Sequence, residues 1–181
     1  MKAILFSGAH GVGKGYFLNK VKECIWQYEV YSASGLIEKY QASTDAGYKK
    51  VSDVKHNQKV LISAIKDAKT NEIKDFILDG HLCIFNARGE LERIPEYFFS
   101  EAQITGIILL QDEPRLICDR INKRDGNKIS MHDIDAMQDE ECRYAKELER
   151  KLQIKYAKIT HECTGKQFLE ILNEMGGNFN E

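Results

Sequence analysis

A glycine-rich stretch near the amino end of the chain has the composition and spacing of a phosphate-binding loop. Residues 8–15 read Gly-Ala-His-Gly-Val-Gly-Lys-Gly, which satisfies the pattern GxxxxGK. In this pattern the glycines let backbone amides point into one concavity, and the lysine adds a positive charge for the β- and γ-phosphates of a nucleotide. The pattern predicts a site for ATP, held by Gly8, His10, Gly11, Val12, Gly13, Lys14, Gly15 and Tyr16.

The flanking sequence favours such a loop over its alternative, a flexible glycine turn. Residues 2–7 form a short apolar run that predicts a buried strand, and residues 14–27 place apolar side chains at helical spacing. A strand, a glycine turn and a helix, in this order, are the context in which the pattern binds phosphate. We therefore reject the flexible turn.

Two polar residues follow a second strand, predicted over residues 75–79. Asp79 ends this strand and is expected to hold Mg²⁺, directly or through water, because carboxylate oxygens suit this ion. The alternative is that Asp79 only starts a turn with Gly80. His81 is expected to have a supporting role, because a lone histidine more often makes structural hydrogen bonds.

All seven arginines lie in the second half of the chain, at positions 88, 93, 115, 120, 124, 143 and 150. Guanidinium groups bind phosphate oxygens through paired hydrogen bonds. Arg120 and Arg124 are four residues apart and share one face of a predicted helix. Arg143 is expected to join them from the next helix, so that these arginines and Lys14 act catalytically on the transferred phosphoryl group. For each arginine the alternative is a solvated residue or a salt-bridge partner.

Predicted strands and helices alternate along the chain. Strands are expected over residues 2–7, 29–31, 75–79, 104–110 and 156–159, with helices between and after them. This alternation indicates an α/β fold with a parallel sheet, helices on both faces, and a ligand beyond the carboxyl ends of the strands. The residues expected to cap the later helices are Ser34, Ser52 or Asp53, Asp112, Ser130 and Thr164.

The composition predicts one globular domain over residues 1–181. The 26 basic residues nearly balance the 28 acidic ones, and the net charge of −2 argues against a nucleic acid partner. The longest strongly apolar stretch, residues 104–110, is too short to cross a bilayer, so no membrane association is expected. The five cysteines form no CxxC pair and the chain does not open like a signal peptide, so a cytoplasmic location is expected. The sequence leaves protein partners unknown.

Several short motifs resemble those of adenylate kinases. Most P-loop proteins, the class defined by GxxxxGK, have Ser or Thr after the lysine, whereas adenylate kinases accept glycine, as at Gly15. Residues 76–80 resemble the Asp-Gly strand end of adenylate kinases, and Asp79-Gly-His81 is similar to the Asp-x-His motif of the archaeal type. Further matches to the archaeal type are Gly47-Tyr-Lys, Gln58-Lys-Val-Leu, Gly89-x-Leu, Asp112-Glu-Pro-Arg, Arg120-x-x-x-Arg124-Asp125 and Arg143-Tyr-Ala.

This resemblance implies a small nucleoside monophosphate kinase with the three-layer P-loop NTPase fold, in which a five-stranded parallel sheet has helices on both faces. It also implies an acceptor-binding segment over about residues 32–70 and a short lid over about residues 124–130. The chain departs from the archaeal type at Phe85-Asn86, where that type places an arginine. The residues expected to contact the acceptor are Ser32, Gln58, His81 and Arg88.

The sequence therefore predicts a kinase that uses ATP and Mg²⁺ to phosphorylate a nucleoside monophosphate, with AMP as the favoured acceptor. Two other functions stay open. One is an ATP-binding regulatory module or slow ATPase switch that has no acceptor. It is favoured by Tyr16, where adenylate kinases usually have Thr, and by the missing arginine near Phe85. The other is a P-loop kinase of a different small metabolite.

Overall fold

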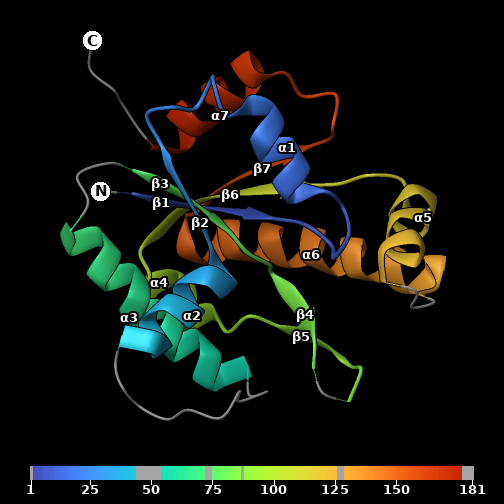
Figure 1. The fold of residues 1–181 in the computed structure, drawn as a ribbon, viewed down its shortest axis with the longest axis horizontal. Helices are drawn as coiled ribbons and strands as arrows, with labels where there is room; N and C mark the ends of the chain where they lie inside the picture. Colours follow the sequence, from blue (N-terminus) through green and yellow to red (C-terminus); the bar gives the residue numbers. More distant parts are fainter. Residues whose placement is uncertain (1, 44–53, 72–74, 87, 126–128, 177–181) are drawn as a thin grey trace.

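The computed structural model describes residues 2–43, 54–71, 75–86, 88–125 and 129–176, which form a three-layer α/β fold (Figure 1). Its central sheet has five parallel strands in the order β2-β3-β1-β6-β7. The predicted fold class is thus confirmed. The strands are β1 (Ala3–Ser7), β2 (Glu29–Ser32), β3 (Phe76–Asp79), β6 (Ile104–Leu110) and β7 (Lys155–Ile159).

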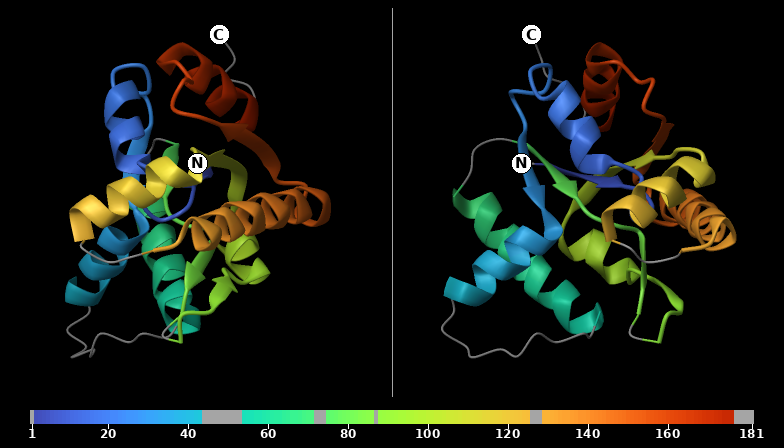
Figure 2. Two further views of the ribbon diagram at one scale, coloured as in Figure 1. Left: turned by 90° about the vertical axis from the view of Figure 1, so that its right-hand side faces the viewer. Right: turned by 45° about the vertical axis from the view of Figure 1, so that its right-hand side comes forward.

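Helices cover both faces of the sheet. In Figures 1 and 2, α1 (Lys14–Val21) and α7 (Gly165–Gly176) lie together on one face, while α2 (Ala33–Ser43), α3 (Val54–Asn71), α4 (Glu96–Glu101) and α6 (Met131–Leu152) lie on the other. Helix α5 (Pro114–Asp125) lies beyond the end of β6, at the right of Figure 1. Among the described residues, no helix is long and apolar enough to span a membrane.

Strand β1 lies in the middle of the sheet and is buried on both faces, as its apolar run predicts. Phe6 packs in the cluster under α1 and α7, where its ring centroid lies 5.6 Å from those of Phe17 and Phe168. Leu5 points to the opposite cluster, under α2, α3 and α4. Burial of each such side chain contributes about 2 kcal/mol to stability. The glycine loop therefore starts from a firmly held strand.

Two predicted helix caps are confirmed and two predictions are wrong. The Ser130 hydroxyl accepts a 3.1 Å hydrogen bond from the Asp133 amide. Thr164 and Gln167 cap α7 reciprocally, with side chain to amide distances of 2.9 and 3.3 Å. Helix α2 is capped by Ser32 instead of Ser34, because the Ser32 hydroxyl accepts the Gly35 amide at 3.0 Å. Helix α5 begins at Pro114, so Glu113 and not Asp112 is its N-cap, and the Glu113 carbonyl accepts the Ile117 amide at 3.2 Å. The candidate caps Ser52 and Asp53 lie outside the described residues.

The helix predicted over residues 14–27 ends earlier, at Val21. The amides of Cys24, Ile25 and Tyr28 bond to carbonyls only three residues back, so the chain continues in tight turns. These turns bring the chain to β2 and leave Cys24 against Gly165, at the start of α7. Periodicity reveals neither these turns nor the contact with α7.

A small hairpin was not predicted at all. Strands β4 (Cys83–Phe85) and β5 (Leu91–Arg93) pair antiparallel and lead into α4. The side chain of Asn86 closes the turn by accepting the Arg88 and Glu90 amides at 2.9 and 3.0 Å. Strands of this length carry too few residues for an apolar alternation to be recognised.

Candidate active site

The glycine loop connects β1 to α1 and leaves the first turn of that helix open. Gly11 and Gly13 have φ angles of 80° and 97°, in the left-handed region that favours glycine. No side chain caps α1, so the amides of its first turn are available to an anion. This is the arrangement expected of a phosphate-binding loop.

Lys14 lies at the start of α1 and its ammonium group is largely buried. The Nζ atom donates to the Gly8 carbonyl at 3.3 Å and lies 3.6 Å from Oδ1 of Asp79, at the end of β3. Burial lowers the pKa of Lys14, and the charges of Asp79 and Glu141 offset part of this effect. An anionic phosphate in the loop would further favour the charged form.

His81 is a neutral hydrogen-bonding group in this site. Its Nδ1 lies 2.9 Å from the Gly8 carbonyl, which can only accept, so Nδ1 carries the proton. Its Nε2 then accepts from Lys14 Nζ at 3.4 Å. Burial, aided by the charge of Lys14, lowers the pKa of His81 to about 3. The imidazole therefore positions Lys14 and carries no charge near neutral pH.

Arg120 holds the glycine loop from α5. Its guanidinium donates to the Val12 carbonyl at 3.0 Å and pairs with Asp112 at 2.5 Å. His161, which follows β7, donates from Nε2 to the same carbonyl at 2.7 Å. Val12 itself is fully buried and its amide donates to the Ala9 carbonyl at 3.0 Å, so this predicted nucleotide-binding residue holds the loop together and does not face a ligand.

A cavity of about 440 Å³ lies over the loop, and we call it the loop cavity. Lys14, Arg120 and Arg124 give it three cationic side chains. Nη2 of Arg124 lies 2.8 Å from Nε2 of His10, so this loop histidine accepts from the arginine. The loop cavity is lined by Ala9, His10, Gly11, Gly13, Lys14, Gly15, Tyr16, Asp79, His81, Arg120, Ile121 and Arg124.

A second cavity of about 270 Å³ lies between α2, α3 and the β4–β5 hairpin, and we call it the acceptor cavity after the predicted acceptor residues Ser32, Gln58 and His81 that line it. Its walls are mostly apolar, with Ile37, Ile94 and Phe98 among them. Ser32 and the buried Gln58, both predicted to contact an acceptor, add polar groups. Lys14, Asp79 and His81 line both cavities, so the two cavities meet at these residues.

Asp79 suits Mg²⁺ held largely by phosphate oxygens and water. Its carboxylate is partly accessible and faces both cavities, 3.6 Å from Lys14. Burial raises the pKa of Asp79, so a bound cation would favour its ionised form. Among the described residues no group of three His, Cys, Asp or Glu side chains could form a metal cage. A single carboxylate is nevertheless typical for Mg²⁺ bound with a nucleotide.

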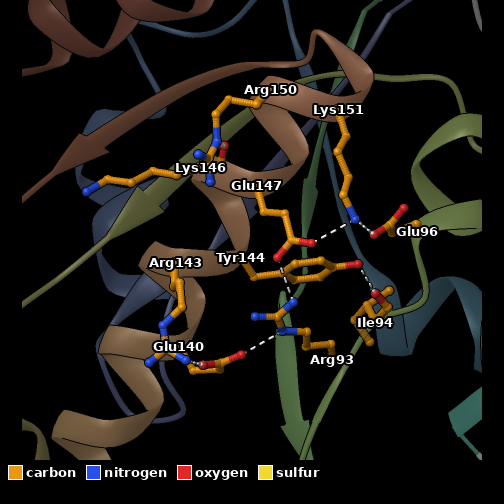
Figure 3. Close-up of polar contacts among 10 residues, drawn as sticks. All are labelled: Arg93, Ile94, Glu96, Glu140, Arg143, Tyr144, Lys146, Glu147, Arg150 and Lys151. Atoms are coloured by element: carbon orange, nitrogen blue, oxygen red, sulfur yellow. Dashed lines mark hydrogen bonds and ion pairs between the residues drawn. The ribbon is translucent and has the colours of Figure 1, made fainter.

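Two predicted site residues lie elsewhere in the structure. Arg143, expected at the transferred phosphoryl group, is 67% exposed on α6 and pairs with Glu140 at 2.6 Å. Figure 3 shows it beside a cluster in which Arg93 bridges Glu140 and Glu147 and stacks over Tyr144. Arg88 is exposed in the hairpin turn. Neither residue lines the loop cavity or the acceptor cavity.

The sequence analysis missed two residues that contact the loop region. His161 lies two residues after the carboxyl end of β7, at the edge of the sheet where the ligand was expected, so this position could have indicated a site residue. Glu141 is fully buried and accepts from the Ser7 hydroxyl at 3.0 Å. It interrupts the apolar stripe of α6 at helical spacing, between Met137 and Tyr144, which is an unusual place for a carboxylate.

Comparison with known proteins agrees with this geometry. The family model described as AAA domain matches residues 7–138, which include the glycine loop, Asp79 and α5. The chain belongs to this family. It is also 29% identical to an adenylate kinase of Sulfurisphaera tokodaii over 141 residues, which are 71% of this chain and 72% of that enzyme.

Solved structures show the same fold. A tunicamycin resistance protein of Deinococcus radiodurans superposes with a TM-score of 0.59 at 16% identity, covering 97% of this chain and 95% of that one. A sugar kinase from Janibacter sp. HTCC2649 superposes with a TM-score of 0.53 at 12% identity, covering 97% and 94%. The resemblance to P-loop nucleoside monophosphate kinases is therefore confirmed, and the comparisons support a nucleotide or small-molecule kinase.

Proposed function

We propose that this P-loop protein transfers the γ-phosphoryl group of ATP to a nucleoside monophosphate, with AMP as the first acceptor to test. The observation that supports this proposal most is the meeting of the two cavities at Lys14, Asp79 and His81. A donor in the loop cavity and an acceptor in the other would place their reacting groups beside these residues, and such positioning is a large part of phosphoryl-transfer catalysis.

Each side chain has a defined role in this proposal. Lys14 and the open amides of α1 bind the donor phosphates, while Arg120 and Arg124 neutralise the charge of the transferred group. Asp79 holds Mg²⁺, which when bound offsets the charge of the phosphate oxygens. A monophosphate oxygen attacks as an anion, so the reaction needs no general base.

The proposal treats the chain as one kinase domain with an acceptor-binding segment over residues 32–70 and a lid over residues 124–130. Ser32 and Gln58 from the first of these line the acceptor cavity. Arg124, at the edge of the second, lines the loop cavity. Residues 44–53, with Gly47, Lys49 and Lys50, lie outside the described residues, as do residues 126–128.

A second candidate is a kinase whose acceptor is an uncharged alcohol. The only charged side chains among the described residues of the acceptor cavity are Lys14 and Asp79. A monophosphate carries about two negative charges and would place them next to the donor's phosphates. Among the described residues of the acceptor cavity, no cation besides Lys14 is present to pair with them. For an alcohol, Asp79 would accept the hydroxyl proton as the new bond to γ-phosphorus forms and the bond to ADP breaks.

A panel of acceptors tests both candidates. The purified protein is incubated with ATP, Mg²⁺ and either a nucleoside monophosphate or a neutral sugar or amino alcohol, and phosphorylated products are identified by mass spectrometry. We expect ADP formation that depends on AMP. Transfer only to alcohols would replace the first candidate by the second. ADP formation that no acceptor stimulates would overturn both candidates and favour the ATPase switch.

A further inference from the structure

Glu141 of α6 is the only carboxylate that is buried among the described residues, and the proposed function gives it no role. Burial of an ionised carboxylate without a directly paired cation is costly. Its Oε1 accepts hydrogen bonds from the Ser7 hydroxyl at 3.0 Å and from the Leu82 amide at 3.2 Å. Its Oε2 has no hydrogen-bond partner within the described part of the chain. Such a group calls for an explanation.

The two residues that Glu141 contacts stand directly next to site residues. Ser7 precedes Gly8, and Leu82 follows His81. The Ser7 hydroxyl also accepts the Leu82 amide at 2.9 Å, so the three groups form a closed hydrogen-bonded triangle. The triangle joins the end of β1 to the segment after β3, and these are the segments that meet at the Gly8 carbonyl.

We propose that Glu141 is a positioning residue that, through Ser7 and Leu82, holds Gly8 and His81 in place and thereby fixes Lys14 at the junction of the two cavities. The Gly8 carbonyl accepts from both His81 and Lys14, at 2.9 and 3.3 Å, so a shift of either segment would move the ammonium group. The inference rests on the proposed function, because Lys14 needs this placement only if the loop binds nucleotide.

The charge of Glu141 also acts on Lys14. Burial raises the pKa of Glu141 to about 7, while the hydrogen bonds from Ser7 and Leu82, the charge of Lys14 and the nearby Cys83 amide oppose this rise. The other titratable groups that feel its charge are Cys83 of β4 and Tyr156 of β7. Glu141 is therefore expected to lose its charge as the pH falls through about 7, and with it one of the two carboxylates that favour the ammonium form of Lys14.

The test compares wild type with Glu141→Gln, which keeps the shape and an acceptor oxygen but cannot ionise. At about pH 8.5 we expect the variant to have about 10-fold lower kcat. At about pH 5.5 the wild-type residue is protonated, so the ratio of the two kcat values should approach one. The matched control is Glu149→Gln, an exposed glutamate on the same helix, which should equal wild type at both pH values. Thermal melts establish that each variant is folded.

A second variant covers the case in which Glu141→Gln does not fold. Ser7→Ala removes the hydroxyl of the triangle and should also lower kcat by about 10-fold at alkaline pH. A ratio for Glu141→Gln that is the same at both pH values, or unchanged kcat for both variants, would overturn the inference.

Nucleotide affinity separates a failure of this inference from a failure of the proposed function. The dissociation constant of ATP is measured by calorimetric titration for each protein at both pH values. If wild type binds ATP but phosphorylates no acceptor, the transfer proposal fails, and a loss of affinity in Glu141→Gln confined to alkaline pH still supports the positioning role. If wild type does not bind ATP, the proposed function and this inference both fail.

Discussion

The loop cavity and the acceptor cavity share Lys14, Asp79 and His81, but the chain builds them in different ways. The loop cavity takes most of its lining from one continuous segment and from one face of α5. The acceptor cavity takes one to three residues from each of β1, β2, α2, α3, β3, β4 and α4. One cavity is therefore encoded locally, and the other depends on the packing of distant elements.

Their chemistry differs as much as their construction. The loop cavity combines three cationic side chains with the open amides of a helix start. The acceptor cavity is mostly apolar, with the buried Gln58 as a specific polar group. Phosphate recognition needs charge, which any sequence of this pattern supplies, whereas recognition of the acceptor depends on shape and a few hydrogen bonds. Variants on the two sides should therefore have separable effects.

The largest expected effect comes from Lys14→Ala at the shared junction. Loss of the ammonium group should lower phosphoryl transfer about 1000-fold and weaken ATP binding, because this charge contacts the donor phosphates in the proposed function. Coupled ADP assays and calorimetric titration with ATP provide the measurements. Lys166→Ala, an exposed lysine in α7, is the control and should behave as wild type. An activity of Lys14→Ala within about tenfold of wild type would show that the loop cavity is not the donor site.

The difference between local encoding and packing of distant elements also explains which parts of the fold could be predicted from the sequence. The strand, glycine turn and helix at residues 2–21 follow from local patterns, because each element is long enough to show its period. The β4–β5 hairpin and α4 were missed because each is short. Together with the link between β5 and α4, they supply Ile84, Ile94 and Phe98 to the acceptor cavity, so the missed elements belong to the cavity that distant segments build.

The predicted site residues also divide into those placed by local sequence and those placed by packing. Arg120 and Arg124 were placed by their spacing in a single helix, and both line the loop cavity. The position of Arg143 depended on how α6 packs against the sheet, which a sequence pattern does not give. On α6, Arg143 pairs with Glu140. The face of this helix that approaches the start of the glycine loop carries Glu141 instead. Sequence periodicity does not reveal the role of this buried carboxylate.

An intermediate effect is expected from Gln58→Leu in the acceptor cavity. The change replaces a buried amide by an apolar side chain of similar size. The KM for the acceptor should therefore rise about 10-fold while the KM for ATP stays the same. Steady-state kinetics with each substrate varied in turn provides both values. Lys59→Ala, an exposed neighbour on α3, is the control. A rise in the KM for ATP instead would mean that the roles of the two cavities are reversed.

The smallest effect is expected from Arg143→Ala, which tests whether this arginine belongs to either cavity. Its guanidinium is 67% exposed and pairs with Glu140 within one helix, so its removal should change kcat by less than about twofold and stability by less than about 0.5 kcal/mol. Arg120→Ala is the comparison and should lower transfer about 100-fold, because Arg120 lines the loop cavity and holds the Val12 carbonyl. Kinetic assays and urea denaturation of both variants provide the measurements. Equal losses of kcat in the two variants would mean that Arg143 reaches the phosphates during the reaction, and the loop cavity would then gain a cation from α6.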